Sequence, residues 1–244
     1  MTLEGRVVLV TGGAKRLGQS IALALARRGA SVVISYRSSQ QEAQKTLQKL
    51  LRLESKASAI PADLTEGISV KRLMTCIQKK YGRLDVLINS AANFERTPFE
   101  RLTEHQWDHA LDTNLKGTFL CALHASRLMR RYKSGKIINI ADWAGLRPYR
   151  DYLPYCVSKA GIFGLTQALA KELAPNIQVN AIAPGPILPP EGMRSRECTR
   201  ILQRVPLKRW GNPDDIANTV LFLIEGTDFM TGSTVFVDGG QLIA

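Results

Sequence analysis

The chain has 244 residues, of which 45% are hydrophobic and 22% charged, and 33 Lys and Arg against 21 Asp and Glu give a formal charge of +12. This composition is that of a folded protein rather than of a disordered chain. No apolar run reaches the roughly 18–20 residues that cross a bilayer, the N-terminus lacks the plan of a signal peptide, and the four cysteines form no CxxC pattern. We therefore expect a cytoplasmic protein with no membrane partner, no disulfide framework and no metal site.

The positive charge leaves nucleic acid, an anionic membrane surface and an acidic substrate open as partners. The basic residues are spread over several predicted elements, and the sequence contains no helix-turn-helix pattern, aromatic stacking platform or arginine-rich tail. We therefore expect a small-molecule substrate and no nucleic-acid partner, with most of the charge on an ordinary basic surface.

Short β-branched runs alternate with longer amphipathic stretches along the chain. This alternation is typical of βαβ units, in which helices cover both faces of a parallel sheet. About seven strands without a repeat or a linker predict an α/β fold: one Rossmann-type doubly wound parallel sheet in a single domain, residues 1–244. Residues 186–206, after a connection with four prolines at 184–190, are expected to form a substrate flap. The expected strands cover residues 6–11, 31–36, 57–62, 84–89, 136–140, 178–182 and 233–237, and the expected helices cover residues 17–28, 40–53, 69–81, 104–132 in two segments that meet near 114–117, 155–173, 194–205 and a stretch from 213 onward.

A glycine-rich turn lies directly between the first expected strand and the first expected helix. Residues 11–18 read TGGAKRLG, so Gly12 and Gly18 allow the backbone to turn tightly and to approach a pyrophosphate. The N-terminus of the following helix offers free N–H groups and the positive end of the helix dipole. The position of this turn favours a dinucleotide site over a purely structural turn.

The end of the second expected strand distinguishes the two nicotinamide cofactors. An NAD site usually carries Asp or Glu there, which accepts a hydrogen bond from the ribose 2′-hydroxyl. This chain has Tyr36, Arg37 and Ser38 instead. Arg37 can stack on adenine and pair with a 2′-phosphate, Ser38 can donate to that phosphate, and Lys15 and Arg16 add positive charge from the first loop. We therefore predict NADPH as the cofactor, with a solvated basic turn as the alternative.

Tyr155 and Lys159, in the segment YCVSK, lie one turn apart on the same face of an expected helix. A free tyrosine has a pKa of about 10, so it needs an adjacent cation to act as an acid or base near neutral pH. Lys159 can supply that charge and can also hold the nicotinamide ribose. Tyr132 and Lys136 have the same spacing, but they flank a loop and the start of a strand and would not share a face. Tyr155 and Lys159 are therefore the candidate catalytic pair.

Jointly and in order, these motifs resemble the short-chain dehydrogenase/reductase family, from about Gly5 to the C-terminus. The resemblance implies that Tyr155 donates a proton, that Lys159 lowers the pKa of Tyr155, and that Asn114 holds a water in a proton relay. It also implies a homotetramer with an interface near the last strand. The expected cofactor-binding residues are Gly12, Lys15, Arg16, Leu17, Gly18, Tyr36, Arg37, Ser38, Asp63, Leu64, Asn89, Ser90, Ala91, Tyr155, Lys159, Pro184, Gly185 and Ile187.

Two departures from the common family pattern resemble the pteridine reductases. Arg16 replaces a third glycine, and Asp142 stands 13 residues before Tyr155, where most members carry serine. Phe94 matches the aromatic residue that stacks on the pterin ring in that branch. Reduction of a ring C=N requires protonation of nitrogen, which a carboxyl of raised pKa can perform, whereas a carboxylate would repel the oxygen of a reacting carbonyl. The resemblance therefore implies a dihydropterin-like substrate. The expected substrate-binding residues are Arg16, Phe94, Asp142 and Tyr155, and the expected catalytic residues are Asn114, Asp142, Tyr155 and Lys159.

Two other functions stay open. Within the same family, the substrate can be a 3-oxoacyl thioester on an acidic carrier protein, which basic residues of this chain would dock; Asp142 argues against it. The remote alternative is a non-enzymatic module that binds NADPH or nucleic acid, and the intact set of Asn114, Tyr155 and Lys159 argues against that.

Overall fold

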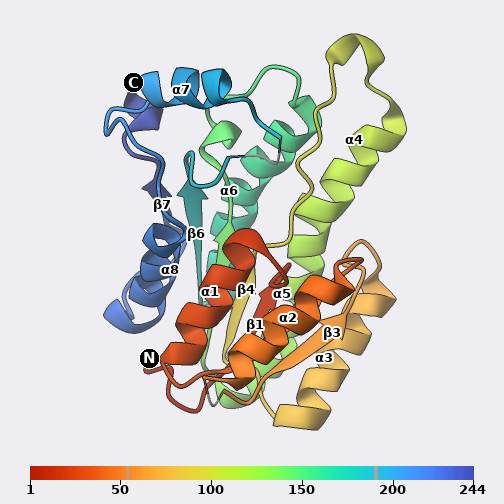
Figure 1. The fold of residues 1–244 in the computed structure, drawn as a ribbon. Coiled ribbons are helices and arrows are strands. Elements are labelled where there is room, and N and C mark those ends of the chain that lie inside the picture. The colour runs from red at the N-terminus through yellow and green to blue at the C-terminus, as the bar shows by residue number, and fades with distance from the viewer. Residues whose placement is uncertain (54, 190–191) are drawn as a thin grey trace.

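The computed structural model describes residues 1–53, 55–189 and 192–244, so residues 190 and 191 of the expected flap lie outside the described residues. In the described part of the chain, seven strands form one parallel sheet in the order β3-β2-β1-β4-β5-β6-β7 (Figure 1). The predicted doubly wound sheet is confirmed. The strands are β1 Val7–Thr11, β2 Ser31–Tyr36, β3 Ser58–Pro61, β4 Val86–Asn89, β5 Gly135–Ile140, β6 Ile177–Pro184 and β7 Thr234–Val237.

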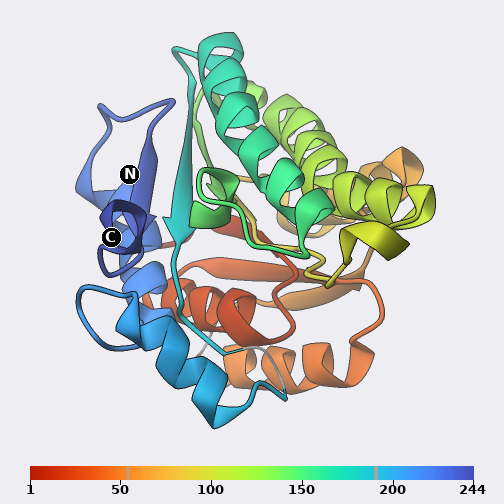
Figure 2. The same cartoon turned by 90° about the horizontal axis from the view of Figure 1, so that it is seen from above.

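Helices cover both faces of the sheet, and Figure 2 shows the sheet between two helical layers. One layer contains α1, α2 and α8, and the other contains α3, α5 and α6. Strand β1 is buried on both sides, because Val8 and Val10 pack into the first layer while Val7 and Leu9 pack into the second. A central parallel strand therefore appears as a continuous apolar run. The helices are α1 Arg16–Arg27, α2 Gln40–Leu51, α3 Gly67–Tyr81, α4 Glu104–Leu111, α5 Gly117–Met129, α6 Leu153–Leu173, α7 Ser195–Gln203 and α8 Pro213–Leu221.

The predicted helical stretch at 104–132 contains a π-helical turn, Asp112–Lys116, between α4 and α5. Such single turns are rare and often lie at functional sites. Here the turn carries Thr113 and Asn114 at the side of the sheet where the strands end.

Several predicted boundaries differ by one or two residues from those of the structure, and two of them lie beside the carboxyl edge of the sheet. Strand β6 continues through Pro184, which pairs with Val237 of β7, so the strand ends two residues later than expected. Helix α6 begins at Leu153 rather than at Tyr155, with Pro154 in its first turn. Proline fits there because the first turn has no intrahelical use for its missing N–H. Both corrections place the ends of these elements closer to the carboxyl edge of the sheet.

The flap helix α7 lies beyond the carboxyl ends of β6 and β7 (Figure 1). Among the described residues, none of the helices combines the length and the apolar character needed to cross a bilayer.

Candidate active site

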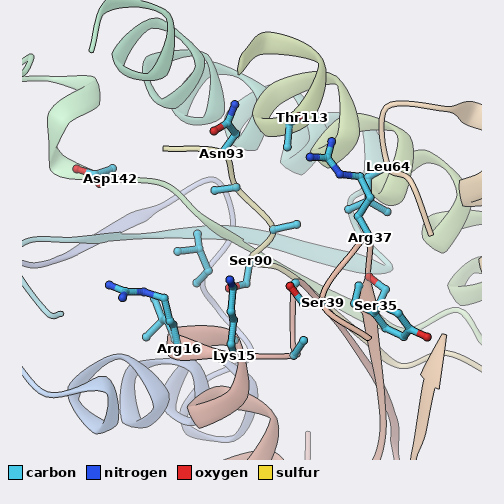
Figure 3. A pocket seen from close by; sticks show the side chains of 18 of the residues that line it. Lys15, Arg16, Ser35, Arg37, Ser39, Leu64, Ser90, Asn93, Thr113 and Asp142 are labelled. Atoms are coloured by element: carbon cyan, nitrogen blue, oxygen red, sulfur yellow. The ribbon is translucent and has the colours of Figure 1, made fainter. Parts of the chain in front are cut away.

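A cleft of about 520 Å³ opens at the carboxyl edge of the sheet. Figure 3 shows it between the loop after β1, the end of β2 and the segment after β4. In an open α/β sheet, ligands bind at this edge, where the strand order reverses. Every expected cofactor-binding residue except Asn89 lines the cleft. Asp142, which was predicted for substrate binding and catalysis, also lines the cleft. The lining residues that were not predicted are Ala14, Ser35, Ser39, Ala62, Thr65, Ala92, Asn93, His109, Thr113, Ile140, Ala141 and Leu188.

The glycine-rich loop forms one wall, and its shape depends on the absence of side chains. Gly12 has a φ of +63°, and a Cβ on it would lie 2.8 Å from the Cα of Ala91. A Cβ on Gly18 would collide with the carbonyl oxygen of Gly12. The segment after β4 is held against the loop because the backbone N–H groups of Ser90 and Ala91 donate to Thr11 Oγ1 at 3.0 and 3.2 Å. This leaves a narrow cradle of backbone, as a bound pyrophosphate requires.

The other end of the cleft is basic and rich in hydroxyls. In Figure 3 the side chain of Arg37 reaches from the end of β2 toward Leu64 and Thr113. Asp63 is fixed by its neighbour, since the N–H and the hydroxyl of Thr65 donate to Asp63 Oδ1 at 2.9 and 2.8 Å. Burial works to raise the pKa of Asp63, but the hydrogen bonds from Thr65 and the charge of Arg37 outweigh it, so the pKa is lowered. A carboxylate and a guanidinium therefore face the same end of the cleft.

The residues that the sequence analysis missed at this end had a local signal. Thr113 directly precedes Asn114, and His109 lies four residues before Thr113 on the continuing helix, so both turn toward the same side. Ser39 extends the Arg37–Ser38 segment by one residue.

At the opposite end of the cleft lie Asp142, Tyr155 and Lys159. The hydroxyl of Tyr155 donates to Asp142 Oδ2 at 2.6 Å. Lys159 Nζ donates to the carbonyl oxygen of Ile140 at 2.7 Å and lies 5.7 Å from the centroid of the Tyr155 ring. Tyr155 and Lys159 are both buried, and both come from α6, one turn apart.

Burial is the largest influence on the pKa values of Asp142, Tyr155 and Lys159. It raises the pKa of Asp142 by more than the hydrogen bonds from Tyr155 and Ala144 lower it. Burial, followed by the adjacent Asp142, raises the pKa of Tyr155 well above its ordinary value. Burial lowers the pKa of Lys159 to about 8. Burial and Asp142 are therefore the largest influences on the pKa of Tyr155, and the expectation that Lys159 lowers this pKa stays a prediction.

Asn114 and Asn89 lie behind the cleft rather than in its lining. Asn114 Nδ2 donates to the carbonyl oxygen of Asn93 at 3.0 Å and to Ser158 Oγ at 2.9 Å, and its Oδ1 accepts from the N–H of Asn93 at 2.7 Å. Asn89 is buried and donates to Asn139 Oδ1 at 2.9 Å, which links β4 to β5. The Asn114 side chain fixes the cleft residue Asn93, and the water relay expected of Asn114 stays a prediction. The Asn89 side chain braces the sheet instead of lining the cleft as expected.

The two remaining predicted substrate residues occupy the margin of the site. Phe94 is 44% exposed; its ring stacks on Tyr152 with centroids 4.5 Å apart and meets Tyr155 edge-on at 4.7 Å. Arg16 lines the cleft, and its Nη2 donates to the carbonyl oxygens of Leu188 and Pro189 at 3.3 and 3.1 Å. Arg16 therefore joins the glycine-rich loop to the start of the flap.

Tyr132 and Lys136, the second pair with the same spacing, lie apart. Lys136 is buried, and its Nζ donates to the carbonyl oxygens of Leu223, Ile224 and Thr227, whereas the hydroxyl of Tyr132 donates to Gly82. Among the described residues, no group of three or more His, Cys, Asp or Glu side chains is arranged to hold a metal ion.

Comparisons with known proteins agree with this geometry. The family model described as enoyl-(acyl carrier protein) reductase matches residues 12–241. A 3-oxoacyl-[acyl-carrier-protein] reductase of Synechocystis sp. is 37% identical over 246 residues, covering 99% of this chain and 98% of that protein. A reductase of the same name from Thermotoga maritima is 34% identical over 247 residues, covering all of both chains.

Two solved structures share the whole fold. One, described as a short-chain alcohol dehydrogenase of Sinorhizobium meliloti 1021, has a TM-score of 0.94 and 32% identity, with full coverage of both chains. The other, a variant of actinorhodin polyketide ketoreductase with NADPH, has a TM-score of 0.92 and 29% identity, with 98% of each chain covered. Because the family model and these relatives extend over nearly its whole length, the chain belongs to the short-chain dehydrogenase/reductase family.

Proposed function

We propose that the chain is an NADPH-dependent reductase whose substrate binds beside Tyr155 and Asp142. The cleft fits this cofactor in three respects: a cradle that side chains at Gly12 and Gly18 would fill, a guanidinium at Arg37 where a 2′-phosphate needs a cation, and Lys159 at the end where the ribose of the nicotinamide would lie. One relative of known structure was solved with NADPH. When bound, NADPH supplies the hydride.

The substrate we propose is a cyclic C=N compound of the dihydropterin type. The observation that carries this proposal is the 2.6 Å hydrogen bond from Tyr155 to Asp142, whose pKa burial raises. A carboxyl of raised pKa can deliver a proton to a ring nitrogen. Phe94 beside Tyr155 provides an aromatic surface for a flat ring.

Asp142 and Tyr155 form one proton-transfer path to the substrate. Tyr155, protonated because of its raised pKa, donates its hydroxyl proton to the substrate, and Asp142 returns a proton to the Tyr155 oxygen through the existing contact. Lys159 holds the cofactor ribose and places a positive charge near the developing phenolate. Asn114 keeps Asn93 in position beside them.

The second candidate substrate is a 3-oxoacyl thioester carried by an acidic protein, and the names of the relatives favour it. The two relatives described above are named for the reduction of the thioester. The proposal of a dihydropterin substrate therefore depends only on residues of this chain, above all Asp142. The net charge of +12 suits an acidic carrier.

A substrate panel distinguishes the two candidates. The purified protein is mixed with NADPH and, separately, with dihydrobiopterin, dihydrofolate, a quinone and an acetoacetyl thioester, and the loss of NADPH absorbance is followed. Turnover that depends on a dihydropterin supports the first proposal. Oxidation of NADPH by the thioester alone refutes the first proposal and supports the second. The homotetramer and the cytoplasmic location stay predictions; light scattering on the purified protein would test the first of these.

A further inference from the structure

Asp142 lies between two tyrosine hydroxyls, of which the proposed reaction uses one. Its Oδ2 accepts from Tyr155 at 2.6 Å. Its Oδ1 accepts from the backbone N–H of Ala144 at 2.8 Å and from the hydroxyl of Tyr149 at 3.4 Å. Tyr149 belongs to the loop before α6, and the sequence motifs gave it no role.

The two oxygens of Asp142 are therefore not equivalent. A carboxyl oxygen offers two lone pairs as acceptors. On Oδ1 both are engaged by donors, from Ala144 and from Tyr149, so a proton on the carboxyl has its place on Oδ2. Oδ2 is the oxygen that faces Tyr155, so once the carboxyl is protonated the 2.6 Å hydrogen bond reverses: Oδ2–H donates to the Tyr155 oxygen, and the Tyr155 proton is free to go to the substrate.

Packing holds the Tyr149 hydroxyl in this place. Its ring meets Trp143 edge-on, with centroids 5.4 Å apart, and its backbone N–H donates to Cys156 Sγ at 3.3 Å. Burial, and after it the charge of Asp142, raises the pKa of Tyr149, so the hydroxyl keeps its proton and stays a donor. In the described part of the chain, the other titratable groups that face Asp142 are Tyr155, Lys159 and Cys156.

We propose that Tyr149 is a positioning residue, which by donating to Asp142 Oδ1 directs the carboxyl proton to Oδ2, in line with Tyr155. Within the proposed reaction, the O–H bond of Tyr155 breaks as the substrate takes its proton, the O–H bond on Asp142 Oδ2 breaks as the phenol re-forms, and solvent then reprotonates the carboxylate. This reaction step rests on the proposed function. The arrangement of hydrogen-bond donors around Asp142 is independent of the proposed function.

The test is a titration of the Asp142 carboxyl by carbon NMR of the protein alone, with Asp142→Asn to identify the signal. Tyr149→Phe keeps the ring and removes one donor to the charged carboxylate, so the pKa of Asp142 should rise by roughly half a unit to one unit. Tyr152→Phe is the matched control: it removes a hydroxyl from the same aromatic cluster, and Asp142 is not among the groups that perturb the pKa of Tyr152. The control should leave the pKa of Asp142 unchanged.

An unchanged Asp142 pKa in Tyr149→Phe, or an equal rise in Tyr152→Phe, overturns the proposal. With whichever substrate of the panel is turned over, Tyr149→Phe should lower kcat about three- to tenfold with little change in KM. The same change added to Asp142→Asn should cost nothing more, and a further loss would show that Tyr149 acts elsewhere. Because the titration needs neither cofactor nor substrate, its failure is distinguishable from failure of the proposed function.

Discussion

Replacing Asp142 with serine distinguishes the two candidate substrates. Reduction of a ring C=N needs a proton-donating acid at position 142, whereas reduction of a carbonyl needs a neutral hydrogen-bond donor there. In the reduction of a ring C=N, the carboxyl returns a proton to Tyr155 across the 2.6 Å contact. A hydrogen bond to a charged group contributes about 1.5–3 kcal/mol. At about 1.4 kcal/mol for each factor of ten, its loss lowers the rate about 10- to 150-fold.

A carbonyl substrate predicts the reverse. The oxygen of a 3-oxoacyl thioester gains negative charge during reduction, and a serine hydroxyl at position 142 would donate to it where a carboxylate repels it. One such donor is worth about 10²–10³ in rate where it is well placed. Asp142→Ser should therefore preserve or raise reduction of the thioester.

The assay is kcat/KM of the wild type and of Asp142→Ser with dihydrobiopterin and with an acetoacetyl thioester. Asp142→Asn is the matched control, since its amide oxygen can still accept from Tyr155 but the group cannot carry the acidic proton. The affinity for NADPH, measured by fluorescence titration, should stay the same in both variants. Dihydropterin reduction that is undiminished in Asp142→Ser would refute the reasoning.

Three further predictions concern the cofactor end and the buried lysine. Arg37→Gln should weaken NADPH binding about 10- to 100-fold and leave NADH binding unchanged, because only the former carries the phosphate that the guanidinium pairs with; fluorescence titration of both cofactors checks this. Gly12→Ala should weaken both cofactors about tenfold or more, since its Cβ would lie 2.8 Å from the Cα of Ala91; Gly5→Ala, at a similar φ of +68° with nothing within 4 Å, should leave both affinities unchanged. Lys159 has a folded-state pKa of about 8 against 10.5 for the free side chain, so activity should fall as pH rises through 8. The unfolded chain then binds more protons than the folded one between about pH 8 and 10.5, and the contribution of Lys159 to the free energy of unfolding should rise with pH in that window; urea titrations at several pH values check this rise, and it should be absent from Lys159→Met.

The strands were predictable because a parallel sheet buries both faces of each strand. In β1 and β4, this burial leaves short apolar runs that end where the cleft begins. The two shifted boundaries beside the cleft depend on single residues. Pro184 is compatible with either a strand end or an irregular connection, and Pro154 with either a loop or the first turn of a helix. The π-helical turn at Asp112–Lys116 adds one residue to a helical period, which hydrophobic spacing does not resolve.

In the candidate site, too, some residues could be predicted from the sequence and others could not. Residues that belong to a backbone motif, such as Gly12 and Arg37, lie in the cleft because the strand that precedes them ends there. The positions of Asn114 and Tyr149 depend on rotamers and on the packing of distant segments. Asn114 turns toward Asn93, and Tyr149 reaches Asp142 from a loop without regular structure. The spacing of residues along the sequence does not predict these two contacts, which only the three-dimensional structure shows.

Overall similarity and substrate choice depend on different parts of this molecule. An identity of 34–37% with 3-oxoacyl-[acyl-carrier-protein] reductases establishes the family. A single fold with its cofactor site can serve many substrates. Substrate chemistry depends on the few groups that exchange protons with it. In the function we propose, the buried carboxyl of Asp142, with the phenol of Tyr149 behind it, supplies the acid that reprotonates Tyr155. For this reason an assay of Asp142→Ser with both substrates, rather than similarity along the whole chain, decides which substrate this reductase takes.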